Sequence, residues 1–149
     1  MHARDAIFYG AKNIIIKAND TDVVVIALSV FPSLQEFGLQ KMWVFHGRGL
    51  TADWMPVHDL VSAMTPAKSI GILYFHAFTG CDVVSAFKGK GKKSAWLAWE
   101  MFNEITETFV KLSKRTDEVS DSDLQNLERF VITMYDENKR CYKHQYSKV

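Results

Sequence analysis

Three aspartates in two separate segments are the residues of this chain best suited to chemistry. Asp20 and Asp22 follow the β-branched run Ile14–Ala18, and Asp82 follows an apolar stretch about sixty residues later. Carboxylates are hard oxygen ligands, and Mg²⁺ is usually held by one or two of them together with substrate phosphates. A cation would also relieve the repulsion between clustered carboxylates. The pattern predicts catalytic ligands for Mg²⁺ or Mn²⁺ at Asp20, Asp22 and Asp82.

A basic, glycine-rich hairpin closely follows Asp82. It consists of Lys88, Gly89, Lys90, Gly91, Lys92 and Lys93. Glycine lets the backbone approach a phosphate, and lysines attract a nucleic-acid backbone. A helix starting at Ser94 would also point its positive end at an anion. These six residues are therefore predicted to bind nucleic acid, although a solvated basic loop is the alternative, and the spacing is not that of a Walker A loop.

Other interpretations of the polar residues are open. An Asp-Thr-Asp after a strand is also typical of a turn or a helix cap, and Gly-Cys-Asp at 80–82 of a turn. The Asp-x-Asp spacing also fits a phosphatase with an aspartate nucleophile. His76 lies among aromatic residues and is expected to be a hydrogen-bonded core histidine. Cys81 has no obvious base beside it in the sequence, so we do not expect it to be a nucleophile.

Composition indicates an ordinary globular protein. With 149 residues the chain suits one domain with a substantial core. The net charge of +1 gives no overall preference for nucleic acid, so any basic surface must be local. Two cysteines without an apolar leader indicate an intracellular protein with reduced thiols. The longest apolar run, Val23–Leu28, is too short to cross a membrane.

Alternating helix and strand patterns are expected to position the aspartates. Strands are expected at 14–18, 41–46 and 51–57. Helices are expected at 3–12, 21–31, 58–64, 69–78, 94–102, 104–112 and 124–135. Pro32 is expected to end the second helix, and Pro56 to confine the last strand to a sheet edge. This order favours an α/β fold with a three-layer core, followed by a helical C-terminal half.

The aspartates and the hairpin together resemble a known family. Asp20-Thr21-Asp22 after a strand, then Gly80-Cys81-Asp82, then the lysine hairpin with Ser94-Ala95, resemble the flap endonuclease branch of the PIN-like nucleases. The chain looks closer still to mobile-element-associated animal proteins of this branch. The segments that carry this closer resemblance are Asp20–Val23, Met55–His58 and His76–Lys93.

The resemblance implies a PIN-like three-layer α/β core, a helix-hairpin-helix and C-terminal helices. It also implies two divalent metal ions and hydrolysis of phosphodiester bonds in branched or flapped DNA. Asp20, Asp22 and Asp82 match metal ligands of the family, and Gly89–Lys93 matches the hairpin that grips duplex backbone. A nuclear location follows from this substrate class alone.

The chain also departs from the family pattern. The family's first strand, which carries an aspartate, and a later acidic helix lie upstream of the matched region and are missing here. Lys90 stands where the hairpin usually has an apolar residue. We therefore expect a domain over residues 1–136 that lacks these two elements, with a polar tail at 137–149. A catalytically inactive DNA-binding remnant is the alternative to an active nuclease, and protein partners are left open.

Overall fold

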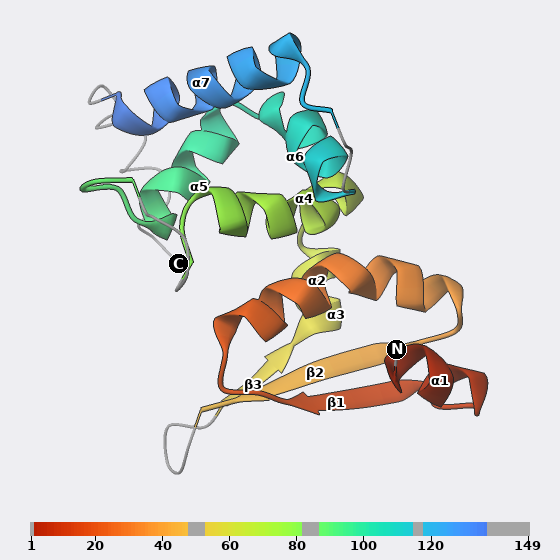
Figure 1. Ribbon diagram of the computed structural model, residues 1–149. Helices are drawn as coiled ribbons and strands as arrows, with labels where there is room; N and C mark the ends of the chain where they lie inside the picture. The colour runs from red at the N-terminus through yellow and green to blue at the C-terminus, as the bar shows by residue number, and fades with distance from the viewer. Residues whose placement is uncertain (1, 48–52, 82–86, 115–117, 137–149) are drawn as a thin grey trace.

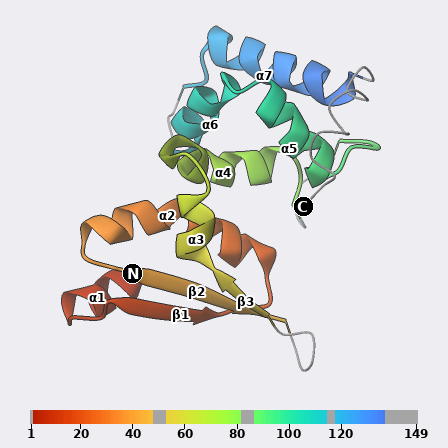
Figure 2. The same ribbon diagram turned by 180° about the vertical axis from the view of Figure 1, so that it is seen from behind.

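The computed structural model describes residues 2–47, 53–81, 87–114 and 118–136 and confirms the expected α/β class (Figure 1). In chain order, the elements are α1 (His2–Phe8), β1 (Asn13–Lys17), α2 (Thr21–Glu36), β2 (Lys41–His46), β3 (Asp53–Pro56), α3 (Val57–Ser62), α4 (Pro66–Phe78), α5 (Lys92–Met101), α6 (Ile105–Ser113) and α7 (Asp121–Tyr135). They form a sheet half and a half made of α4 to α7 (Figures 1 and 2).

The sheet has the order β1-β2-β3. β1 and β2 are parallel and are joined through α2, whereas β2 and β3 form an antiparallel pair. As expected, the strand with Pro56 lies at an edge. α2 and α3 cover one face (Figures 1 and 2), where Met42 and Val44 are fully buried. Within the described ranges no helix covers the other face, so the described part of the core has two layers, and the expected third layer is not confirmed.

α2 continues through Pro32, so the prediction that this proline ends the helix was wrong. Proline lacks an N–H and crowds the carbonyl four residues earlier, which costs about 3 kcal/mol in a helix interior. The neighbouring Phe31 and Leu34 are 1% and 6% exposed, and their burial offsets this cost. The helix ends instead at Glu36, with Phe37 as its C-cap, and the next residue, Gly38, has a φ of 102° that favours glycine.

The second half of the molecule packs around aromatic side chains. Trp99, Phe109 and Phe130 are fully buried, and the ring of Phe75 lies 4.7 Å from that of Trp99 and 6.0 Å from that of Phe109. Gly71 lets α4 approach α6, because a Cβ there would lie 3.1 Å from Cβ of Phe109. α4 also packs against α2 and thus connects the two halves.

Three of these helices begin two or three residues earlier than predicted. α4 begins at Pro66 rather than 69, α5 at Lys92 rather than 94, and α7 at Asp121 rather than 124. The predictions followed apolar residues, whereas a first helical turn is commonly polar. Thr65 caps α4 by accepting from the N–H of Lys68, and Ser120 caps α7. These residues were the overlooked signals.

The helix-hairpin-helix was expected after Gly80-Cys81-Asp82, with its hairpin at Gly89–Lys93, which leads into α5 in the structure. Residues 82–86, with Asp82, lie outside the described residues, as does the expected polar tail at 137–149. The PIN-like core and the helix-hairpin-helix therefore stay predictions. No helix in the described ranges is long and apolar enough to cross a membrane.

Candidate active site

Asp20 and Asp22 lie where β1 passes into α2. Asp20 immediately precedes the helix, and its Oδ1 accepts a hydrogen bond from the backbone N–H of Asp22 at 3.0 Å. An aspartate here satisfies a free N–H of the first turn and interacts favourably with the helix dipole. The helix-cap interpretation of Asp20 is therefore confirmed. The second carboxylate oxygen is not needed for capping, so a capping aspartate can also bind a cation.

Asp22 contacts a histidine from the other half of the molecule. Its Oδ1 lies 2.7 Å from Nε2 of His76, in the last turn of α4. The side chain of His76 is 15% exposed and that of Asp22 is 45% exposed. His76 is hydrogen-bonded, as predicted, but its partner is a half-exposed carboxylate rather than a group of the aromatic core. The contact orients the carboxylate of Asp22.

Lys92 joins the start of α5 to the end of α4. Its Nζ donates to the carbonyl oxygen of His76 at 2.5 Å and to Oγ1 of Thr79 at 2.7 Å. The ammonium group thus donates to the carbonyl oxygen of His76, and carbonyl groups in the last turn of a helix have no backbone N–H partner within the helix. Burial lowers the pKa of the Lys92 ammonium, while the nearby Cys81 and Asp22 act to raise that pKa.

These side chains surround one open cavity of about 650 Å³. It is lined by Asn19, Asp20, Thr21, Asp22, His76, Gly80, Cys81 and Lys92. The two segments singled out in the sequence therefore meet, although about sixty residues separate them. Asp82 is outside the described residues, but the preceding residue, Cys81, is part of the cavity wall.

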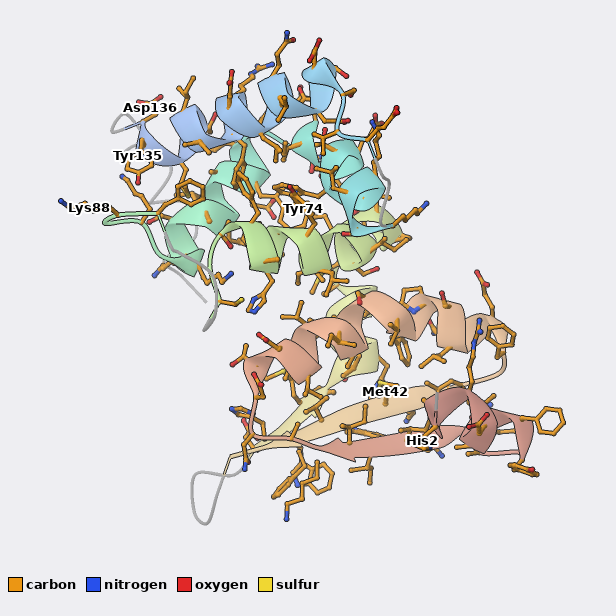
Figure 3. The ribbon with its side chains drawn as sticks, viewed as in Figure 1. His2, Met42, Tyr74, Lys88, Tyr135 and Asp136 are labelled. Atoms are coloured by element: carbon orange, nitrogen blue, oxygen red, sulfur yellow. The ribbon has the colours of Figure 1, made fainter. Side chains whose placement is uncertain are left out.

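The hairpin lysines lie in different environments. Lys92 lines the cavity, whereas Lys88 and Lys93 are exposed. The hydroxyl of Tyr135 at the end of α7 donates to the carbonyl oxygen of Lys88 at 2.9 Å (Figure 3), and Nζ of Lys90 lies 5.1 Å from the Tyr135 ring centroid. Gly89 has a φ of 71°, which suits glycine in this turn.

The start of α5 adds a further group of donors. Gly91 is the residue before the helix and offers no side chain to cap the first backbone N–H groups. Those N–H groups and the exposed Lys93 can therefore receive an anion from outside. Phosphate oxygens of a nucleic-acid backbone are anions of this kind.

The donors fit a hard divalent cation only in part. Within the described residues, no three His, Cys, Asp or Glu side chains are grouped so as to hold a metal ion. The carboxylates of Asp20 and Asp22 are nevertheless the oxygen donors that Mg²⁺ or Mn²⁺ takes, and Mg²⁺ commonly completes its shell with water and substrate phosphate. Asp22 uses one oxygen on His76. The chemistry of the donors therefore suits such an ion if Asp82 or a substrate supplies further oxygens.

Two features of the site were missing from the sequence prediction. The first is the pairing of His76 with Asp22, and the second is the inward direction of the Lys92 ammonium. Both are contacts between residues far apart in the chain, and the hydrophobic periodicity of a sequence does not predict such contacts. One sequence feature could have indicated that His76 belongs to the site: it lies in the same short segment as Gly80 and Cys81.

Comparison with known proteins assigns no family and no function to this chain. No family model matches the sequence, and no curated protein or solved structure matches it significantly. Any function must therefore be argued from the residues of the cavity and the hairpin.

Proposed function

We propose that this chain is a domain or fragment of a metal-dependent nuclease that hydrolyses phosphodiester bonds in branched or flapped DNA. The observation that supports the proposal is the shared cavity. Asp20 and Asp22, the residue before Asp82, and a lysine of the basic hairpin all line it. An acidic site for a cation beside a basic site for a phosphate backbone is the combination that such hydrolysis requires.

Each residue has a proposed role in this reaction. Asp20, Asp22 and Asp82 hold Mg²⁺ or Mn²⁺, and His76 orients Asp22. A divalent cation bound there supplies Lewis-acid polarisation of a phosphoryl oxygen. Lys88, Lys90 and Lys93, with the N-terminus of α5, hold the DNA backbone, while Lys92 fixes the end of α4 next to the cavity.

The decisive experiment is a calorimetric titration of Mn²⁺ into the parent and the Asp20→Asn/Asp82→Asn variant. Asparagine at position 20 still caps α2, so the change removes charge without removing the cap. Binding should occur in the parent and be lost in the double variant. The exposed Asp121→Asn serves as the matched control and should bind like the parent. A folded parent that binds no Mn²⁺ would refute the metal site.

The second candidate is a DNA-binding domain that does not cleave. It is favoured by the contact of Asp22 with His76 and by the lack of a third metal donor in the described ranges. This alternative predicts DNA binding that needs no metal and no cleavage of a flapped substrate. Lys88→Gln/Lys93→Gln should then weaken binding and reduce its salt dependence by about 0.9 per lost phosphate contact.

A further inference from the structure

Among the residues that the structure describes, no helix covers the face of the sheet opposite α2 and α3 (Figures 1 and 2). The register places three rows of side chains on this face, and we call these residues the open sheet face. The rows are Lys17, Phe45 and Trp54; Ile15, Trp43 and Pro56; and Asn13 with Lys41. Because alternate residues of a strand point to opposite faces, the buried Met42 and Val44 lie on the covered side.

Apolar side chains on this face are strongly exposed. Ile15 is 61% exposed and Trp54 is 52% exposed. The Trp54 ring lies 4.9 Å from the Phe45 ring, at an interplanar angle of 53°. An exposed group of apolar side chains next to polar ones is typical of a binding surface.

The charges on the open sheet face have one sign. Among the described strand residues on it, only Lys17 and Lys41 are charged, and both are positive. Nζ of Lys17 lies 6.0 Å from the centre of the Phe45 ring. Asp53, the acidic strand residue in the described ranges, pairs with His46 and points to the other face.

Aromatic rings beside lysines match the chemistry of single-stranded nucleic acid. Unpaired bases stack on aromatic side chains whatever their sequence, and lysines attract the backbone phosphates. We propose that the open sheet face binds single-stranded nucleic acid. Bases stack on Phe45 and Trp54, and phosphates lie near Lys17 and Lys41.

The position of Lys17 relates this surface to the cavity. Lys17 is the last residue of β1, and the chain passes from it to Asp20 within three residues. A single strand on the open sheet face can therefore continue toward the cavity. The binding itself does not depend on a metal ion or on cleavage, so it can be tested separately from the proposed nuclease activity.

The test is fluorescence anisotropy of a labelled oligothymidylate of about 12 nucleotides, titrated with the full chain in the presence of a chelator. Trp54→Ala should weaken binding by about tenfold or more, because it removes a stacking surface. Lys17→Gln should lower the slope of log affinity against log salt by about 0.7, the value for one phosphate contact with a single strand. This second variant keeps the apolar surface of the sheet.

Matched controls separate this surface from the rest of the molecule. Phe8→Ala removes an aromatic ring that is 85% exposed, and Lys114→Gln removes an exposed lysine of the helical half; both should bind like the parent. Lys88→Gln/Lys93→Gln should weaken duplex binding while keeping the oligothymidylate affinity. If only this hairpin variant lost oligothymidylate binding, the open sheet face would be the wrong site while hairpin binding would stand.

Two further results would overturn the proposal. One is a folded parent that does not bind the oligothymidylate. The other is a parent dimer, seen by light scattering, that Trp54→Ala converts to a monomer. In that case a second copy of the chain covers the open sheet face.

Discussion

Asp22 and His76 come from helices that are distant in the sequence, and their 2.7 Å contact fixes a carboxylate at the cavity wall. The same histidine accepts a hydrogen bond from Lys92 through its carbonyl oxygen. A short chain of contacts thus runs from α2 through the end of α4 to the start of α5. The consequence is that a lysine of the basic hairpin contributes to the architecture of the site.

Replacing Lys92 should therefore lower stability more than replacing its neighbour. Lys92→Met keeps an apolar stem but leaves His76 O and Thr79 Oγ1 without their donor, which should cost about 1–3 kcal/mol. Lys93→Met is the control, because an exposed lysine should change the free energy of unfolding by no more than about 0.5 kcal/mol. Urea unfolding monitored by circular dichroism measures both. Equal stability of the two variants would contradict the role given to Lys92.

The helices and strands show which parts of the fold can be predicted from local sequence patterns. The strand at 41–46 and the start of α2 at Thr21 were predicted correctly, because a β-branched or aromatic run and an aspartate cap are local signals. The passage of α2 through Pro32 was not predicted, because burial against distant elements decides it. The candidate site was likewise predicted only in part. Its residue types were visible in the sequence, whereas the partners of Asp22 and Lys92 depend on packing.

Pro32 gives a direct test of this competition within α2. Pro32→Ala should restore a backbone donor and remove a clash inside the helix, for a gain of up to about 3 kcal/mol. The more flexible unfolded chain reduces that gain by about 0.4–1 kcal/mol. The free energy of unfolding from urea titration should therefore rise. A decrease would mean that the ring of Pro32 contributes packing that outweighs the helix defect.

The start of α7 contains a second local feature, the capping box of Ser120 and Asp123, whose contribution to stability depends on pH. The carboxylate of Asp123 accepts from Lys111 and from the hydroxyl and N–H of Ser120, and these bonds lower its pKa from 3.8 to about 2. The folded state therefore favours the ionised form. Its contribution to stability is present above the ordinary carboxyl pKa of 3.8 and is lost as the pH falls through about 2.

Asp123→Asn should accordingly lose stability relative to the parent near neutral pH and converge with it in acid. Urea unfolding from neutral pH down to pH 2 would measure the difference in free energy of unfolding between the two proteins. This difference should become smaller as the pH falls toward 2. Asp121→Asn, at an exposed acid in the same helical turn, should follow the acid profile of the parent. A constant difference between parent and Asp123→Asn at every pH would show that the pKa of Asp123 is not lowered by folding.

At the scale of the whole molecule, α4 is the element that joins the sheet half to the helical half. It packs on α2 at one side and on α6 at the other, and buried residues of both halves belong to one continuous core. The site lies at this junction, because Asp22 comes from one half and His76 and Lys92 from the other. A change that loosens α4 should therefore affect the sheet as well as the bundle.

Gly71→Val tests this coupling. The added side chain meets Phe109 at about 3.1 Å and must push α4 from α6, which should lower the free energy of unfolding by about 1–3 kcal/mol. Ala77→Val places the same side chain at an exposed position of the same helix and controls for the presence of a β-branched residue in α4. Hydrogen exchange read by mass spectrometry should show equal losses of protection in β2 and in α6. Loss confined to α4 and α6 would mean that the halves unfold separately and that the cavity between them can open without unfolding the sheet.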